Sequence, residues 1–371
     1  MIKIKDIEKL KPTKITNKIN SKIKKSLNND YNRIDSNNEK SLNIKLFKKI
    51  FLIFLIFIIV KLVIVFSKKI FSLNSNVINV AYAFDKDYDY ITHVSMKSIM
   101  LSQNKNTYIK FYLLVSSEIK EEQIKVINNI CEKHKNCEIK FFKMEERYKD
   151  LNFKGYITWS TGDFYRLALP DLLPQEKKIL YLDSDTLIYK DLTKLYNYNI
   201  TDKYIAGMLE FKNFNVFGKK IDYFVNTGAI IMNLEELRKD NICKKTENFI
   251  RENNSKLLFP VNFSFNYICN GKVGFFSPQY AQLGFCGGNI EDYINNIQHE
   301  FSKEEIIKVS KDPYIFHIIG IKNKPWNGIP HFKGTVCYDI ITKFYQMAMK
   351  TDYYYEILEK YKISRDYLRK E

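Results

Sequence analysis

Short apolar runs alternate with helical and turn segments from Val77 to the end of the chain. Val77–Phe84, Tyr108–Val115 and Lys178–Leu182 have the composition of buried strands, whereas Glu121–His134 has the spacing of an amphipathic helix. Further strands are predicted at Glu138–Met144, Tyr204–Leu209 and Ala229–Asn233, and further helices at Ile91–Leu101, Asp339–Lys350 and Tyr353–Tyr361. This alternation predicts an α/β fold with a mostly parallel sheet and helices on both faces. No G-x-G-x-x-G sequence follows the first strand, so a dinucleotide-binding fingerprint is absent.

An apolar run of 17 residues, 50–66, precedes this region and contains one charge, Lys61. A helix of that length spans roughly 25 Å, a little less than the ~30 Å hydrocarbon core of a bilayer. Because the run is apolar on all sides, we predict a single transmembrane signal-anchor, in preference to an interfacial or buried core helix. The basic leader before it is expected to stay in the cytosol while the large C-terminal part crosses the membrane.

The net charge of +17 is distributed unevenly along the chain. Residues 1–49 hold 14 Lys and Arg against 5 Asp and Glu, so more than half of the excess lies in the first eighth of the sequence. A nucleic-acid-binding fold would carry its charge on the folded part or show a recognisable module, and neither feature is present. The pattern argues against nucleic acid as a partner and indicates a basic tail beside a membrane segment.

Two carboxylates follow the predicted strand Lys178–Leu182, in the sequence Asp183-Ser184-Asp185. Residues two apart on an extended segment point to the same side, so both carboxylates can face one point. Parallel sheets place ligand sites beyond the carboxyl ends of their strands. The pair suits a hard divalent cation, Mg²⁺ or Mn²⁺, that bridges to phosphate oxygens. Aspartates also end strands because they favour turns, so the triplet alone leaves the metal site open.

Four segments, taken in order, resemble glycosyltransferase family 8, whose members are retaining enzymes that use nucleotide sugars and adopt the GT-A fold. The resemblance covers roughly residues 77–327. Its motifs are NVAYAFDKDY (79–88), STGDFYRLALPDLLP (160–174) leading into YLDSD, FVNTGAIIMNLEELR (224–238) and HIIGIKNKPW (317–326). The second motif looks like the branch of lipopolysaccharide galactosyl- and glucosyltransferases. The resemblance implies a GT-A, Rossmann-like sheet flanked by helices.

The resemblance also implies the metal and nucleotide positions. Asp183, Asp185 and His317 would bind Mn²⁺ or Mg²⁺, and two carboxylates with an imidazole leave open positions on such an ion for diphosphate oxygens. In the family, the positions of Asp85 and Tyr88 hold the uracil, and that of Asp87 lies near the ribose. The positions expected to contact the UDP-sugar are Ala83, Asp85, Asp87, Tyr88, Arg166, Ser184, Gly320 and Lys324.

The residues expected at the reacting centre are Arg166, Asn226 and Asn262. Arg166 matches the family's arginine near the diphosphate and the sugar, where a guanidinium can bind oxygens with two parallel hydrogen bonds. Asn226 would contact the donor sugar. Gly320 would let the backbone approach the phosphates, and Lys324 would neutralise them, so that the metal and Lys324 together stabilise the leaving diphosphate.

The chain departs from the family pattern at the segment that usually contains D-Q-D-x-L-N. The aspartate of that motif is Val261 here, and the glutamine on the reacting face is Asn262. This departure puts the sugar donor, the acceptor and the activity in question. A smaller departure is the spacing of Gly320 and Lys324, which are separated by three residues where two is also common.

The sequence therefore predicts a retaining, metal-dependent hexosyltransferase that moves a hexosyl group from a UDP-sugar to a hydroxyl of a glycan or lipid-linked saccharide. The alternative is a GT-A domain that binds a nucleotide sugar or glycan without catalysis, which the Val261 and Asn262 departure favours. A phosphohydrolase of the haloacid-dehalogenase type also begins with D-x-D. That class needs Thr or Val two residues after the second aspartate, where this chain has Leu187.

The predicted organisation has five parts: a basic polar tail (1–49), a transmembrane signal-anchor (50–66), a short stem (67–76), a GT-A catalytic domain (77–335) and a C-terminal helical cap (336–371). Six cysteines follow the apolar run, and Cys131 and Cys137 are close enough in sequence to pair. Two locations remain open for this single-pass membrane protein. It is a type II protein of the Golgi if the source is eukaryotic, or associated with the inner membrane if it is bacterial.

Overall fold

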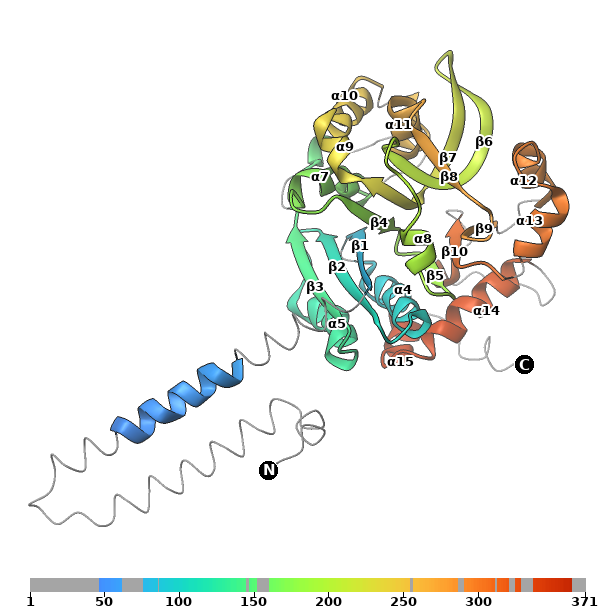
Figure 1. Ribbon diagram of the computed structural model, residues 1–371. Helices are drawn as coiled ribbons and strands as arrows, with labels where there is room; N and C mark the ends of the chain where they lie inside the picture. Colours follow the sequence, from blue (N-terminus) through green and yellow to red (C-terminus); the bar gives the residue numbers. More distant parts are fainter. Residues whose placement is uncertain are drawn as a thin grey trace, which may run out of the picture. The chain divides into compact units, whose positions relative to one another are not determined.

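The structure of the chain is a computed structural model (Figure 1). It describes residues 47–61, 76–85, 87–144, 147–151, 160–253, 256–285, 290–310, 312–319, 324–327 and 336–361. The chain divides into two compact units, Met1–Leu73 and Asn74–Glu371.

In the first unit, residues 47–61 form a helix whose apolar side chains, such as Phe51 and Phe54, are exposed. This helix includes the first part of the predicted membrane span, while residues 62–66 of the span and residues 1–46 lie outside the described ranges. Of the helices within those ranges, none is both long enough and apolar enough to cross a bilayer. The predicted transmembrane segment 50–66 stays a prediction, because its last five residues lie outside the described ranges.

A seven-stranded sheet, in the order β3-β2-β1-β4-β7-β6-β8, forms the centre of the larger unit (Figure 1). Neighbouring strands pair in parallel, except that β7 runs antiparallel to both β4 and β6. The strands are β1 (Asn76–Phe84), β2 (Thr107–Val115), β3 (Cys137–Lys143), β4 (Lys178–Leu182), β6 (Ile205–Val216), β7 (Lys219–Asn233) and β8 (Val273–Phe276). The prediction of a mostly parallel sheet is confirmed.

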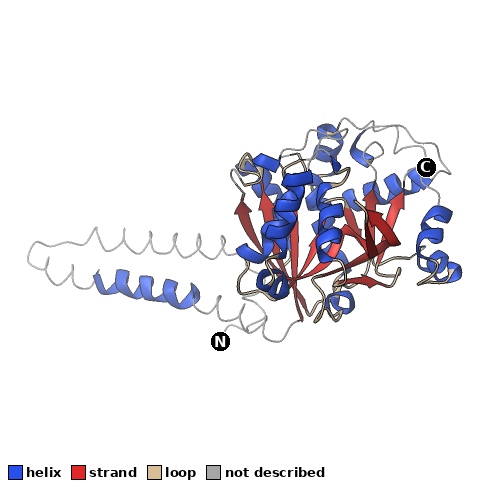
Figure 2. Cartoon of the chain, turned by 90° about the horizontal axis from the view of Figure 1, so that it is seen from above, coloured by secondary structure: helices blue, strands red, loops and turns tan. Residues whose placement is uncertain are grey.

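Helices cover both faces of this sheet, as predicted (Figures 1 and 2). Alternate side chains of β1 enter two different cores: Ala81 packs in the core with Phe164 and Leu237, and Tyr82 packs in the core with Ile127. The helices of the first core are α6 (Gly162–Tyr165), α7 (Leu169–Leu172), α9 (Leu234–Lys239), α10 (Ile242–Asn253) and α11 (Pro260–Cys269). Those of the second are α4 (Asp89–Ser102), α5 (Glu121–Lys133) and α8 (Thr193–Tyr196).

A second, three-stranded sheet, which the sequence did not predict, has the order β5-β10-β9. Its strands are β5 (Thr186–Ile188), β10 (Ile315–Ile319) and β9 (Ala281–Phe285). Strand β5 is antiparallel to β10, and Thr186 lies opposite His317 in their register. This pairing brings a histidine 131 positions later in the chain to the turn that follows β4.

Strands β6 and β7 are longer than predicted because they form a hairpin that extends beyond the sheet (Figure 1). Its turn residues, Phe217 and Gly218, have positive φ values of 49° and 78°. A turn with two such residues matches the twist of the flanking strands, which explains the two-residue connection. The hairpin carries Asn226 and Gly228 on β7, which both belong to the site described below.

Helices α14 (Val336–Ala348) and α15 (Tyr354–Lys360) lie where the sequence predicted helices at Asp339–Lys350 and Tyr353–Tyr361. Phe344 and Tyr345 of α14 pack with Ile91 of α4 and Phe316 of β10 in a third core. The remaining helices are α12 (Ile290–Ile297) and α13 (Lys303–Ser310), with short 3₁₀ turns at Lys149–Leu151, Arg166–Ala168 and Pro325–Asn327. The C-terminal helices thus pack against the elements that surround the β4–β5 turn.

Cys131 near the end of α5 and Cys137 at the start of β3 form a disulfide, as their spacing suggested. Cys243 and Cys269 are free and buried. Burial raises the pKa of both thiols, so these two cysteines behave as packing residues.

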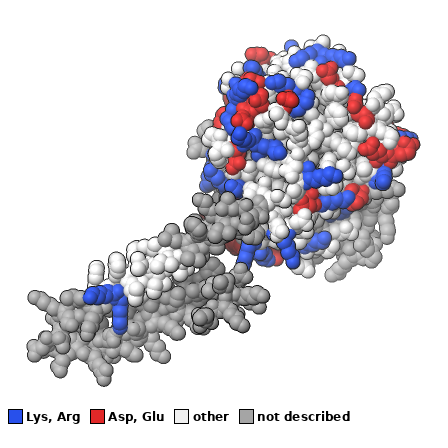
Figure 3. Space-filling model, viewed as in Figure 1, with Lys and Arg blue, Asp and Glu red and all other residues white. Residues whose placement is uncertain are grey.

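On the face of the larger unit seen in Figure 3, acidic and basic side chains are interspersed.

Candidate functional site

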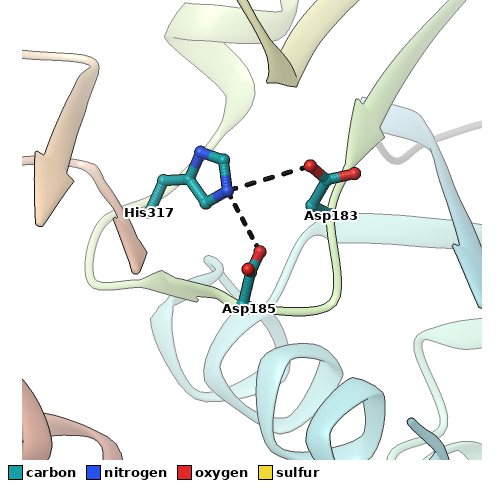
Figure 4. Close-up of side chains that lie close together, drawn as sticks. All are labelled: Asp183, Asp185 and His317. Atoms are coloured by element: carbon teal, nitrogen blue, oxygen red, sulfur yellow. Dashed lines mark ion pairs between the residues drawn. The ribbon is translucent and has the colours of Figure 1, made fainter. Parts of the chain in front are cut away.

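Asp183 and Asp185 lie in the turn between β4 and β5, and His317 lies on β10 beside that turn. His317 Nε2 is 3.0 Å from Asp185 Oδ1 and 3.8 Å from Asp183 Oδ2. One ligand atom of each residue lies within 4.8 Å of the others, and the three side chains point toward one another (Figure 4). The fold therefore brings together the three residues that the sequence singled out as metal ligands.

Asn226 on β7 determines which nitrogen of His317 carries the proton. Its Oδ1 accepts a hydrogen bond from Gly228 N–H at 2.9 Å, and its Nδ2 donates to Glu210 Oε1 at 2.9 Å, which fixes the orientation of the amide. The same Oδ1 lies 3.1 Å from His317 Nδ1, so Nδ1 must be the donor. In the neutral ring, which is the form that binds a metal, this tautomer presents an unprotonated Nε2 to the two carboxylates.

Electron-pair donors from three side chains consequently face one point. Asp185 Oδ1 is buried and accepts no hydrogen bond from the part of the chain that the structure describes, although the bare Nε2 of His317 is only 3.0 Å away. An anionic oxygen in that position is costly unless a cation or a donor satisfies it. Two carboxylates and an imidazole, the latter oriented by an amide behind it, fit a divalent ion such as Mn²⁺ or Mg²⁺.

Gly228 on β7 leaves the space that this arrangement needs. A Cβ atom at this position would lie closer than 3.0 Å to the imidazole of His317 and to the carboxylate of Asp183. The backbone carbonyl of Gly228 also accepts a hydrogen bond from Asp183 N–H at 2.7 Å. The glycine of the N-T-G sequence is thus required by close approach of the metal ligands to the β7 backbone.

Arg166 lies behind Asp183 and is only 3% exposed. Its Nη2 donates to Asp183 Oδ1 at 2.9 Å, its Nη1 to Thr227 O at 2.7 Å and its Nε to Asp163 O at 3.0 Å. The guanidinium also stacks over the ring of Tyr181, whose hydroxyl donates to the same Asp183 oxygen at 2.8 Å. In this arrangement Arg166 positions the carboxylate of Asp183, and its predicted contacts with the diphosphate and the sugar stay a prediction.

Lys324 precedes the Pro325–Asn327 turn and donates to Asp185 Oδ2 and to the carbonyl oxygen of Ile318. Burial raises the pKa of Asp185, but Lys324, together with His317 when its ring is protonated, outweighs burial and holds this pKa below its ordinary value. Asp185 is therefore a carboxylate at any physiological pH. Lys324 thus stands beside the candidate metal ligands, and Gly320 lies outside the described residues.

Further carboxylates surround the site. Burial raises the pKa of Asp163 to about 7; Arg166 opposes this shift, and the charges of Asp183 and Asp85 add to it. Asp163 Oδ1 is 3.9 Å from Arg166 Nη2. Such a concentration of negative charge favours a bound cation, which is consistent with the ligand set.

The predicted nucleotide positions lie on β1 and at the start of α4. Ala83 is half-buried at the end of β1, Asp85 and Asp87 follow it in a turn, and the ring of Tyr88 contacts that of Trp326 at 6.0 Å between centroids. Asp85 Oδ1 accepts a hydrogen bond from Asp87 N–H at 3.2 Å.

Ser184 is buried, and its hydroxyl forms a hydrogen bond with a residue of α4. Thr92 donates its only hydroxyl proton to Tyr88 O at 2.7 Å, so the 2.7 Å contact between the two hydroxyls is a bond from Ser184 to Thr92. The side chain of Ser184 therefore ties the Asp183–Asp185 turn to α4, and only its backbone is available to a ligand.

Glu210 on β6 is a site residue that the sequence analysis missed. It accepts a hydrogen bond from Asn226 at 2.9 Å, is also bonded to Asn262, and interacts electrostatically with His317. Burial raises its pKa, while both asparagines oppose the shift. A carboxylate directly after the predicted strand Tyr204–Leu209 gives no local signal, so only the hairpin geometry reveals it. Val261, in contrast, is 5% exposed and packs in the core.

Replacing Asn226 with alanine should weaken metal binding by about 10- to 100-fold, because His317 loses the acceptor that fixes its tautomer and ring orientation. Titration of the purified chain with Mn²⁺, followed by electron paramagnetic resonance, measures this change. Asn215→Ala, at an exposed asparagine of the same hairpin, is the matched control and should leave the affinity unchanged. Equal Mn²⁺ affinity in Asn226→Ala and the unmodified chain would contradict the role of Asn226.

Comparison with known proteins gives consistent sequence matches. The sequence profile of Glycosyl transferase family 8 matches residues 79–329. A Haemophilus influenzae protein is 28% identical over 207 residues, which cover 53% of this chain and 61% of that protein. Glycosyltransferase GlyA of Streptococcus pneumoniae is 25% identical over 250 residues, which cover 66% of this chain and 32% of that protein. The chain thus spans less than two thirds of the length of either relative.

Solved structures share the fold. The galactosyltransferase LgtC, in complex with sugar donor and acceptor analogues, superposes with a TM-score of 0.58 at 19% identity, covering 74% of this chain and 96% of that one. The bifunctional glycosyltransferase WbbM superposes with a TM-score of 0.61 at 20% identity, covering 77% of this chain and 52% of that one. These likenesses confirm the predicted GT-A-like arrangement of a mixed α/β sheet flanked by helices.

Proposed function

This chain belongs to glycosyl transferase family 8, and we propose that it is a metal-dependent enzyme that transfers a hexosyl group, with retention, from a UDP-sugar to a hydroxyl of a glycan or lipid-linked saccharide. The convergence of Asp183, Asp185 and the bare Nε2 of His317 on one point carries this proposal. Such a ligand set leaves positions open for the diphosphate of a nucleotide sugar.

The protein groups around this point are suited to the departure of a nucleotide diphosphate. A divalent ion held by the three ligands would supply Lewis-acid stabilisation of the leaving phosphate oxygens. Lys324 adds a positive charge next to Asp185, where negative charge develops on the leaving group. Arg166 and Tyr181 hold Asp183 from behind, so the ligand does not have to reorganise when the sugar donor binds.

Glu210, Asn226 and Asn262 supply the polar groups on the β6–β7 side of the metal ligands. We assign them to the hydroxyl groups of the transferred sugar and the acceptor, because amide and carboxylate groups pair well with hydroxyls. Retention by front-side attack requires no strong nucleophile from the protein, since the leaving phosphate can assist the acceptor hydroxyl. The reaction is therefore compatible with Val261 at a position where the family usually has an aspartate.

The second candidate, a GT-A domain that binds a nucleotide sugar without catalysis, is favoured by the same residue. Val261 packs in the core and offers no polar group to a substrate. Within the described residues, Glu210 is the carboxylate that contacts Asn262. Catalysis then depends on whether Glu210 and Asn262 can perform the roles of the aspartate and the glutamine in the family's D-Q-D-x-L-N motif.

We expect the purified full-length chain to hydrolyse one UDP-sugar slowly in the presence of Mn²⁺, and to stop when the metal is chelated. The measurement is UDP release from UDP-glucose, UDP-galactose, UDP-xylose and the UDP-N-acetylhexosamines, with and without EDTA. Hydrolysis of one sugar donor identifies the transferred group. If UDP binds in a Mn²⁺-dependent manner but no donor is hydrolysed, the binding domain is the better description. If neither occurs, both candidates fail.

A further inference from the structure

A small polar cavity lies between α4, α5 and the turn that connects α14 to α15. Its lining residues are His93, Lys97, Asn129, Ile130, Lys133, His134, Thr351 and Asp352. His93 and Lys97 are four residues apart on α4, as are Asn129 and Lys133 on α5, so each pair lies on one helix face. None of these residues belongs to the metal site described above. The cavity has room for about one water-sized particle.

His93 is the most unusual residue of this cavity. It is 2% exposed, and neither ring nitrogen has a hydrogen-bond partner among the described residues. Burial, with Lys97 and Lys133 adding, lowers the pKa of His93 to about 3, so the ring is neutral and carries one N–H donor. Its ring packs edge-on against that of Tyr353, with 5.0 Å between the ring centroids. A buried imidazole that makes no hydrogen bond indicates a missing partner in the cavity.

The charges that line the cavity do not balance. Lys133 forms an ion pair with Asp352, the one carboxylate among the lining residues. Lys97 Nζ lies 3.1 Å from His134 Nε2, an uncharged acceptor because burial and the two lysines lower the pKa of His134. Burial, and then Lys133, lower the pKa of Lys97 as well. One lysine charge therefore remains without a counter-charge next to an unpartnered N–H group.

We propose that this cavity binds a single halide ion, chloride under ordinary conditions, between Lys97 and His93. A monovalent anion supplies the missing counter-charge for Lys97 and accepts a hydrogen bond from the neutral ring of His93. The space suits a monatomic ion, whereas a phosphate or sulfate with four oxygens is too large. A water molecule fits the space but leaves the lysine charge unbalanced.

The position of this ion gives it a structural role. It would join the middle of α4 to the turn at Thr351 and Asp352, where α15 begins. At its other end, α15 is tied to the predicted nucleotide loop, because Lys360 pairs with Asp89 and the hydroxyl of Tyr361 donates to Asp87 O at 2.9 Å. The halide would thus anchor the helix that supports that loop, independently of whether the chain is catalytic.

The first test compares the thermal unfolding of the full-length chain in sodium chloride, bromide and gluconate at equal ionic strength. We expect Tm to be about 2–4 °C higher in the halides than in gluconate, because only the folded state binds the ion. Lys97→Met and His93→Phe should abolish this difference. Lys178→Met is the matched control, since Lys178 is also a half-buried lysine with a lowered pKa but does not line the cavity, and it should keep the difference. The same Tm in all three salts, or the same halide response in Lys97→Met, would overturn the proposal.

The second test requires no variant. Crystals of the chain grown in sodium bromide should show one anomalous bromine peak between Lys97 Nζ and the ring of His93. Electron density without anomalous signal at that point identifies a water molecule and would refute the halide site. Loss of the halide response together with intact UDP-sugar hydrolysis, or the reverse, separates this proposal from the proposed enzymatic function.

Discussion

Asp185→Asn should reduce Mn²⁺-dependent UDP-sugar hydrolysis by about 1,000-fold or more. The carboxylate supplies Oδ1 to the point shared with His317 and Asp183, and its Oδ2 holds Lys324 beside the leaving group. An amide of the same size keeps the volume but removes the negative charge that a divalent ion requires. The loss of a directly bound ligand should exceed the 10- to 100-fold effect of groups that only orient ligands. Release of UDP at saturating sugar donor measures the effect.

The same variant should also lose Mn²⁺ affinity while remaining folded, which circular dichroism and a Tm measurement verify. Asp202→Asn, at an exposed aspartate in a turn before β6, is the matched control and should leave turnover unchanged. Full activity of Asp185→Asn or Asp185→Ala in Mn²⁺ would eliminate this aspartate as a metal ligand. Equal losses of turnover in Asp185→Asn and Asp202→Asn would indicate a general defect of the protein and not the loss of a metal ligand.

The elements that the sequence predicted correctly are those with strong local periodicity. Strand β4 begins and ends at the predicted residues, because the four residues after Lys178 are apolar and Asp183, which follows them, begins a turn. The second sheet was missed because β5 has only three residues, a length at which neither alternation nor composition is distinctive. Strand β7 was predicted ten residues short because its first half mixes charged and aromatic residues and pairs with β6 in the hairpin, where Ile221 and Phe224 form a small core of their own.

The residues of the candidate site, like the elements of the fold, could be predicted from the sequence only in part. Asp183 and Asp185 are identifiable from the sequence because they follow an apolar strand. The assignment of His317 depended on the resemblance to a family, since the β5–β10 pairing that places it cannot be derived from spacing. The resemblance predicted Arg166 near the diphosphate and the sugar; that its guanidinium binds Asp183 depends on the position of Asp183, which is a property of the fold. Glu210 has no sequence signal of its own, because its contacts come from β7 and α11.

Gly228→Ala tests whether the metal site has the close packing seen in the structure. The added Cβ would lie closer than 3.0 Å to the ring of His317 and to Asp183, so at least one ligand must move. A displacement of about 1 Å at a reacting centre costs on the order of 100-fold in rate, and here two ligands are affected together. We therefore expect turnover to fall by at least ~100-fold, with a matching loss of Mn²⁺ affinity, although no ionisable or polar group is removed.

Gly218→Ala provides the control that separates this effect from a general cost of replacing glycine. Gly218 has φ of +78° in the hairpin turn, and a Cβ there would meet no atom within 4 Å. Alanine at that position should cost about 1 kcal/mol of stability through backbone strain and leave Mn²⁺ affinity and turnover unchanged. If Gly228→Ala binds Mn²⁺ as tightly as the unmodified chain, His317 and Asp183 cannot be ligands of the same ion. The metal would then be held by Asp185 with at most one of these two residues, and the proposed arrangement of the site would have to be abandoned.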